Sequence, residues 1–177
     1  MKRYIIGIGL ILLMLLGACG KKEKETFFGN WVVEKDGAFQ VQDFQCGDDA
    51  EIIRKAYPDE KFEEQDGELI GSAHTWNGAE YRIIYTFQSS DLKDLGSARI
   101  SITCTSADNM TEVLKILYEE AKAAMPDPIT DGGFDTILEK EGDVSWEGQD
   151  GSLVFLHKMT GQNVIGIQVT MPEKEGK

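Results

Sequence analysis

Histidine and cysteine, the side chains that most often bind metals and carry redox chemistry in proteins, are scarce in this sequence. There are two histidines and three cysteines in 177 residues, and no Cys-x-x-Cys or Cys-x-x-His spacing occurs. The Walker loop, the dinucleotide fingerprint, the His-Glu-x-x-His motif and the Gly-x-Ser-x-Gly nucleophile elbow are missing as well. The sequence therefore predicts no metal ion, no cofactor and no enzyme that depends on these motifs.

Basic residues are also few. Lys and Arg number 18 against 31 Asp and Glu, which gives a formal net charge of −13 at pH 7. A surface with this excess of carboxylates repels the phosphate backbone of DNA and RNA, so we expect no nucleic-acid partner. The acidity is explained either by solubility or by a cationic partner, and solubility is the simpler explanation.

Only one long hydrophobic run occurs. It extends from Tyr4 to Leu16, two basic residues precede it, and the small pair Gly17-Ala18 follows. Its 13 residues are too few for a membrane-spanning helix, which needs about 20 apolar residues. A basic start, a short apolar run and small residues before a cleavage point are typical of an export signal.

The segment Leu16-Gly17-Ala18-Cys19 resembles the lipobox of bacterial lipoprotein precursors, with Leu three positions before the cysteine and Ala directly before it. This resemblance covers the leader alone. It implies that residues 1–19 are a lipoprotein signal peptide and that Cys19 is the lipidation site, acylated with chains such as palmitate. The implied partner is a membrane, and the implied location is the extracytoplasmic side of a bacterial cell membrane.

The part after Cys19 is expected to be a short tether and one domain. Residues 20–26 (GKKEKET) carry charges and no apolar side chain, and as a flexible coil they span roughly 15 Å. Residues 27–177 are long enough for a single domain with its own core. The leader holds two basic residues and no acidic one, so its removal lowers the net charge to −15.

Cys46 and Cys104 are the two cysteines that remain after lipidation of Cys19. An even pair in an exported protein permits a disulfide bond. The alternative is that both are buried thiols, which act as small apolar residues. The sequence leaves both possibilities open.

Apolar periodicity, turn signals and capping patterns predict the local structure of the domain. Two strands are expected within 27–44, on either side of Lys35-Asp36-Gly37. Further strands are expected at 68–76, 81–88, 97–104, 136–138, 142–146, 152–157 and 164–171, and helices at 49–57 and 110–125. Asn77-Gly78, between two of these strands, is the strongest hairpin signal in the chain.

The predicted order helix, strand, strand, strand occurs twice. Residues 51–57 match 112–118, and 75–78 (TWNG) match 145–148 (SWEG) at an offset of 70. Repeats of this kind usually form one antiparallel sheet with both helices on one face. The predicted fold class is therefore α+β, with an added N-terminal β-hairpin. The arrangement is similar to that of the β-lactamase-inhibitor-protein class, a fold analogy that implies no activity.

Alternation along the strands assigns side chains to the two faces of the predicted sheet. Trp76, Trp146, Tyr85 and Phe155 are expected to face the helices. The other face is expected to bear an apolar centre with a polar rim, an arrangement typical of interaction surfaces. The candidate binding residues on it are Arg82, Ile84, Thr86, Arg99, Val154 and Leu156. Alternatively, the N-terminal hairpin covers this face and completes a sandwich.

Three functions stay open. The favoured one is a membrane-tethered binding module whose ligand is an unknown protein or small molecule. The alternatives are a structural or envelope-maintenance lipoprotein without a defined ligand, and a hydrolase-type enzyme without a visible motif. A pocket lined by a histidine or cysteine with an oriented partner would favour the enzyme. We expect His74 and His157 to be structural, and Asp127, Asp131 and Asp135 lack the spacing of a calcium loop.

Overall fold

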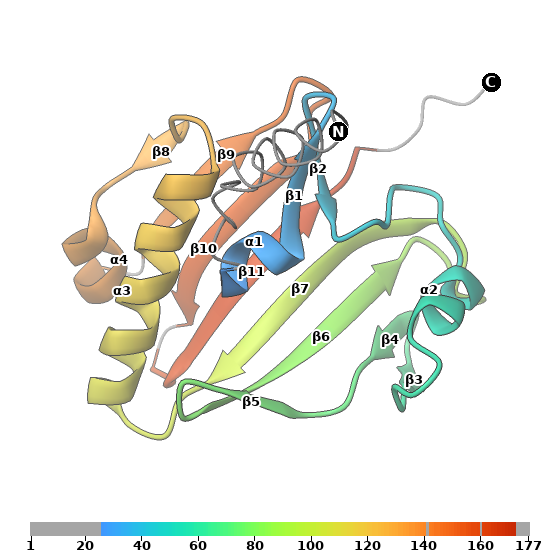
Figure 1. Ribbon diagram of the computed structural model, residues 1–177, viewed down its shortest axis with the longest axis horizontal. Helices are drawn as coiled ribbons and strands as arrows, with labels where there is room; N and C mark the ends of the chain where they lie inside the picture. The colour runs from blue at the N-terminus through green and yellow to red at the C-terminus, as the bar shows by residue number, and fades with distance from the viewer. Residues whose placement is uncertain (1–25, 141, 160, 173–177) are drawn as a thin grey trace, which may run out of the picture.

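The computed structural model describes residues 26–140, 142–159 and 161–172 (Figure 1). Its helices are α1 (Phe27–Trp31), α2 (Ala50–Ala56), α3 (Ala107–Ala124) and α4 (Phe134–Lys140). Its strands are β1 (Val32–Lys35), β2 (Ala38–Val41), β3 (Glu63–Gln65), β4 (Glu68–Ile70), β5 (His74–Trp76), β6 (Ala79–Phe87), β7 (Leu95–Thr103), β8 (Thr130–Asp131), β9 (Asp143–Glu147), β10 (Leu153–Met159) and β11 (Val164–Thr170). The predicted α+β class and the N-terminal hairpin of β1 and β2 are confirmed.

One antiparallel sheet holds nine of the strands. Its order from edge to edge is β3-β4-β6-β7-β11-β10-β9-β8, and β5 pairs with the beginning of β6. The turn between β5 and β6 is Asn77-Gly78, with φ angles of 47° and 73°, values that these two residue types tolerate best. This turn pairs Trp76 with Ala79 and His74 with Tyr81, as predicted.

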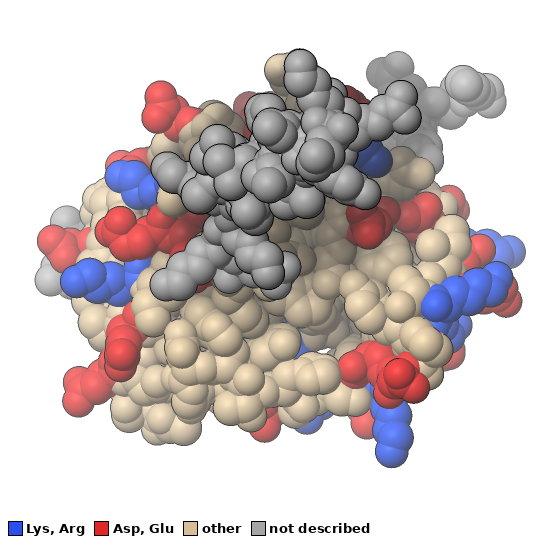
Figure 2. All heavy atoms as spheres, viewed as in Figure 1, with Lys and Arg blue, Asp and Glu red and all other residues tan. Residues whose placement is uncertain are grey.

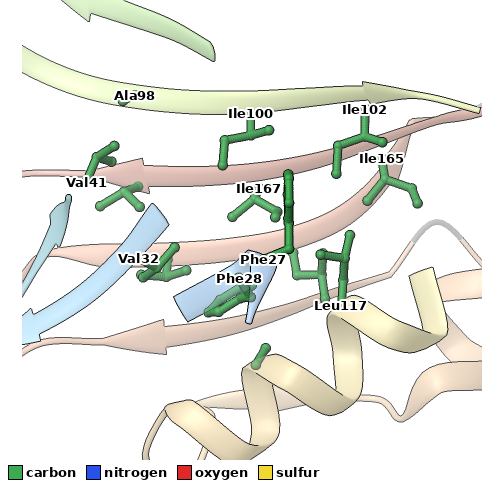
Figure 3. Close-up of a cluster of buried hydrophobic side chains, with 14 of the residues drawn as sticks. Phe27, Phe28, Val32, Val41, Ala98, Ile100, Ile102, Leu117, Ile165 and Ile167 are labelled. Carbon is green, nitrogen blue, oxygen red and sulfur yellow. The ribbon is translucent and has the colours of Figure 1, made fainter. Parts of the chain in front are cut away.

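The helices and the N-terminal hairpin share one face of the sheet, here called the helix-bearing face (Figure 1). In the core, Phe27 and Phe28 of α1 and Val32 and Val41 of the hairpin lie against Ile100 of β7, Ile167 of β11 and Leu117 of α3 (Figure 3). The alternative in which the hairpin covers the other face is therefore wrong. In the described part of the chain, no helix covers that other face, here called the open face.

Helix α3 is the longest helix and follows its sequence pattern closely. The Ser106 side chain accepts a hydrogen bond from the Asn109 backbone, which caps the first turn. The helix ends before Pro126, which cannot continue it. Its buried residues recur at steps of three and four and form the stripe that packs on the sheet: Met110, Val113, Leu114, Leu117, Tyr118 and Ala121.

The two halves of the sheet meet where β7 pairs with β11. Ile100 lies opposite Ile167, so these two strands correspond at an offset of 67. On the outer sides, Ile83 of β6 pairs with Ile100 and Leu156 of β10 pairs with Ile167. Strands β6 and β10 therefore correspond at an offset of 73, whereas the residue match in the sequence suggested 70.

This difference reverses the face assigned to every residue of β10. Val154 pairs with Trp146 and Leu156 pairs with Val144, and all four side chains are fully buried on the helix-bearing face. Phe155 lies on the open face instead. The predictions for Val154, Leu156 and Phe155 were wrong because β9 and β10 are joined by the five-residue loop 148–152. The faces predicted from the sequence require a two-residue turn at this place, and a shift of one residue exchanges the two faces.

Other local differences have local causes. Residues 27–31 form helix α1 and not a strand, because the Thr26 side chain accepts a hydrogen bond from Gly29 N and caps a helical turn. Residues 136–138 belong to α4, whose first turn is closed by a hydrogen bond from Ile137 N to Gly133 O. The short strands β3 and β8 occur in segments that were expected to be loops.

Cys46 and Cys104 are both free thiols, so of the two alternatives the structure has the pair without a disulfide bond. Gly47 N donates to Leu95 O at the beginning of β7, whereas Cys104 follows the last residue of that strand. A strand of nine residues spans about 30 Å. Bridged cysteines need Cα atoms within roughly 7 Å of each other. Burial raises the pKa of the Cys104 thiol, so this side chain acts as a small apolar residue.

Candidate functional site

A pocket of about 170 Å³ lies on the helix-bearing face over β6. In the space-filling view the surface is hollowed there, between α1 and the segment that joins β4 to β5 (Figure 2). Five aromatic side chains line it: Trp31, Tyr57, Phe62, Tyr81 and Tyr85. The other lining residues are Glu60, Gly71, Ser72, His74 and Ile83. These ten residues are called the aromatic pocket below.

Strand β6 supplies the floor. Tyr81, Ile83 and Tyr85 are two positions apart, so their side chains all lie on the helix-bearing face. Tyr85 is buried, whereas Tyr81 and Ile83 are half-buried and reach the pocket. The floor is therefore closed at Tyr85 and accessible at Tyr81, so the pocket is open to solvent at one end.

A break between β4 and β5 forms one side of the pocket. The sequence predicts a single strand over residues 68–76, and a two-residue turn at Asn77-Gly78 would place Ile70 opposite Tyr85. In the structure the ladder is interrupted after Gly71, whose N–H donates to Ile83 O at 2.9 Å, and Ile70 pairs with Ile84. Residues 71–73 lie outside both strands, which brings Ser72 and His74 to the rim of the pocket.

Two pairs of the five aromatic side chains meet at steep angles and form adjoining walls. Trp31 and Tyr81 have ring centroids 6.2 Å apart and planes inclined by 68°, and Phe62 and Tyr85 are 6.4 Å apart and inclined by 64°. Such steep angles are the favoured edge-to-face geometry of aromatic pairs. The rings consequently stabilise one another and enclose the pocket from several sides.

Glu60 is the charged group of the pocket. Its Oε1 accepts a hydrogen bond of 2.5 Å from Ser72 N, and its Oε2 lies 3.1 Å from Nε2 of His74. Desolvation tends to raise the pKa of Glu60, but the bonds from Ser72 and the nearby His74 outweigh it and hold the pKa below its usual value. The carboxylate is therefore ionised at neutral pH, and its position is held by two partners.

The tyrosines of the pocket are neutral. Burial raises the pKa of Tyr57, Tyr81 and Tyr85, and the charge of Glu60 raises the values for Tyr81 and Tyr85 further. The hydroxyl groups of Tyr57 and Tyr85 both donate to Oε1 of Gln42. None of these three rings can therefore serve as a phenolate near pH 7.

The described residues form no metal site, and the carboxylate of a second hollow among them already has hydrogen-bond partners within the chain. No group of three or more His, Cys, Asp or Glu side chains that could hold a metal ion occurs among them. A second hollow, of about 300 Å³, lies beside β2 and includes Asp150. Asp150 already accepts hydrogen bonds from Ser152 N and Oγ, so it is occupied within the chain.

Four of the predicted binding residues do share the open face: Arg82, Ile84, Thr86 and Arg99. They form no continuous apolar centre, however. One row across the sheet runs Ile84, Arg99, Gln168 and Phe155, so two polar side chains separate the two apolar ones. Arg99 lies 3.6 Å from Oε1 of Glu68, which also accepts a hydrogen bond from Thr86. Val154 and Leu156, on the other face, contribute nothing to this surface.

The sequence analysis does not predict the aromatic pocket, although one signal for it exists. The alternation Tyr81, Ile83, Tyr85 indicates an aromatic row on one face of a strand. Trp31 and Glu60, however, come from distant segments that only the fold brings to this row. His74, which was expected to be structural on the face of the sheet that bears the core, has a side chain that is 45% exposed and stacks on Tyr81.

Cys19 and the rest of the predicted signal and tether up to residue 25 lie outside the described residues, so lipidation stays a prediction. Among the residues that are described, no helix is both long enough and apolar enough to cross a membrane. No protein family, no curated protein and no solved structure matches this chain.

Proposed function

We propose that this chain is a lipid-anchored bacterial protein that binds a small organic molecule in the aromatic pocket, on the extracytoplasmic side of the membrane. The observation that carries the proposal is the aromatic pocket itself. It is preformed, lined mainly by apolar rings, and equipped with a few polar groups at its rim. This combination is the usual anatomy of a small-molecule site.

The size of the pocket limits the ligand. Its volume of about 170 Å³ is close to that of an apolar cavity that accepts a benzene molecule, roughly 150 Å³. A single ring or a compact branched group therefore fits, and a peptide side chain of similar size is the largest part of a protein partner that could enter.

Anchoring is supported by the lipobox resemblance of Leu16 to Cys19. Acyl chains contribute about 0.8 kcal/mol for each buried CH₂ group, and two or more chains give stable attachment. The tether of residues 20–26 leads directly into α1, which ends in the pocket residue Trp31. The pocket is thereby held near the membrane surface.

Lipid attachment can be tested at Cys19. Cells that express the full chain should incorporate labelled palmitate into it, and Cys19→Ala should abolish the label completely, since no other residue supplies the acylated thiol. Cys46→Ala, which alters a cysteine inside the domain, serves as the control and should retain the label. Equal labelling of wild type and Cys19→Ala would refute anchoring at this residue.

Ligand binding can be tested by filling the pocket from Gly71. A Cβ at this position would lie 3.4 Å from Oε1 of Glu60 and 3.8 Å from Phe62, so an alanine fits while a leucine extends into the cavity. We expect a set of neutral and charged single-ring and branched compounds, screened by ligand-observed NMR, to include binders of the wild type and of Gly71→Ala. Gly71→Leu should weaken these binders at least tenfold.

The same screen separates this function from the structural alternative. If no compound distinguishes the wild type from Gly71→Leu, the pocket is not a binding site, and an envelope lipoprotein without a defined ligand becomes the better description. Ile83→Phe, which fills the pocket from its floor, gives a second test that does not depend on the behaviour of Gly71→Leu.

His74 is the observation that favours a second candidate, a hydrolytic enzyme. Its imidazole is oriented by Glu60 at the rim of a pocket, as a general base would be. A hydrolase of the nucleophilic type also needs a hydroxyl or thiol in reach of that base. Ser72 is the one serine in the pocket lining, which includes no threonine or cysteine, and its hydroxyl donates a hydrogen bond to Lys61 O. Binding therefore remains the better-supported function.

A further inference from the structure

We infer that the ligand of the aromatic pocket is an organic cation whose charged head is compact and fully substituted, the class to which trimethylammonium compounds belong. This inference rests on the proposed function and names its ligand class. It follows from the charge of the pocket, from the geometry of its rings and from the state of its hydrogen-bonding groups.

The first argument is charge. Among the ten residues that line the pocket, all within the described part of the chain, Glu60 alone is a carboxylate and none is Lys or Arg. An anion would meet this carboxylate without a compensating positive side chain. The whole chain carries a formal net charge of −13, which also attracts cations toward its surface.

The second argument is the aromatic lining. The face of an aromatic ring carries the negative part of its quadrupole and attracts a cation that lies within about 6 Å of its centre. Trp31, Tyr81, Phe62 and Tyr85 form two steeply inclined pairs around the cavity. A compact cation in a cavity of this size contacts several rings at once, and these contacts are stronger where water is excluded.

The third argument is that the hydrogen-bonding groups of three pocket residues already have partners within the chain. Glu60 accepts hydrogen bonds from Ser72 and His74, and the hydroxyls of Tyr57 and Tyr85 donate to Gln42. No buried side-chain nitrogen or oxygen in the described residues lacks a partner. A primary ammonium group would bury N–H donors that need new acceptors, at a cost in free energy. A quaternary ammonium group has no N–H donor and avoids that cost.

Glu60 has a separate role in this arrangement. Because two hydrogen bonds hold its carboxylate at the rim, the negative charge is in place before a ligand enters. A fixed charge of this kind needs little reorganisation on binding, which favours affinity. Neutral compounds of the same shape should gain nothing from it.

The test compares choline with its neutral isostere, 3,3-dimethylbutan-1-ol, in which carbon replaces the charged nitrogen. Binding is measured by equilibrium dialysis against the full chain reconstituted in phosphatidylglycerol vesicles, with protein-free vesicles as the blank. We expect choline to bind the wild type at least tenfold more tightly than the isostere. Gly71→Leu should abolish the saturable binding of choline.

Two variants identify the source of the preference. Glu60→Gln and Tyr81→Leu should each weaken choline binding about tenfold, the range expected for loss of a partly desolvated cation contact, while the isostere is much less affected. Glu63→Gln is the matched control. It removes the same charge from an exposed residue of β3 outside the pocket lining, and it should leave choline binding unchanged.

Each alternative outcome has a definite meaning. Equal affinity for choline and the isostere would overturn the cation inference and leave the proposed function intact, as would neutral binders in the Gly71 screen without any binding of choline. Choline binding that persists in Gly71→Leu, or that falls equally in Glu63→Gln, would show adsorption to the acidic surface and would overturn the inference. Failure of every compound at the pocket would overturn both proposals.

Discussion

Val154→Asp is expected to lower the free energy of unfolding by several kcal/mol, on the order of 4 kcal/mol. Val154 is fully buried on the helix-bearing face, where it lies between Trp146 of β9 and Val169 of β11. A carboxylate there is removed from water, which is costly for a charged group. Since small domains are stable by only about 5–15 kcal/mol, the loss is a large part of the total. Urea denaturation followed by circular dichroism measures it.

Phe155→Asp is the matched control for this prediction. Phe155 is the next residue on the same strand, but it lies half-buried on the open face, where a carboxylate keeps contact with water. We expect a loss of about 1 kcal/mol, mostly from the removed ring. If Phe155→Asp proved more damaging than Val154→Asp, the register of β10 described above would be wrong.

Trp146→Ala should lower the free energy of unfolding by about 3–5 kcal/mol, an effect as large as that of Val154→Asp. The indole is fully buried, packs 6.1 Å from the ring of Phe28, and donates a hydrogen bond of 3.0 Å from Nε1 to Pro126 O. Alanine leaves a cavity and removes the partner of that carbonyl. Trp146→Phe should cost less, because it retains part of the ring and loses mainly the hydrogen bond.

Trp76→Ala is the natural comparison, because the sequence match places Trp76 and Trp146 at equivalent positions. Trp76 is half-buried and stacks on Phe27 with a centroid distance of 4.1 Å. Its removal leaves a site open to water and not a closed cavity, so the loss should be clearly smaller than for Trp146. Equal losses, measured by thermal denaturation, would contradict the difference in burial.

The open face and the aromatic pocket illustrate how one strand serves two surfaces. On β6, Tyr81 and Ile83 line the pocket, while Arg82 and Ile84 point to the open face. Strict alternation makes both assignments from the sequence of this strand alone. Alternation does not tell which of the two faces holds the binding site. The choice depends on Trp31 and Glu60, which the chain delivers to one face from outside the strand.

Local patterns in the sequence were sufficient to predict an element where the interactions that stabilise it lie within that element. The stripe of α3, its end at Pro126, and the Asn77-Gly78 turn are cases of this kind, and each was predicted. The aromatic alternation along β6 was also visible, since it needs only the period of a strand. The prediction of lipidation at Cys19 belongs to this class too, because it rests on a short contiguous motif, and it stays a prediction.

Tertiary structure alone decided the features that depend on loop length and on distant partners. The face of Val154 depends on whether the loop before β10 has an odd or even number of residues, and composition cannot distinguish five residues from four. The pocket depends on the break at Gly71, on α1 and on Glu60, which are separated along the chain and meet only when the core forms. The sequence by itself thus determined most of the elements and the type of sheet. Packing decided which face is buried and where a ligand can enter, because contacts between distant segments leave no periodic trace in the chain.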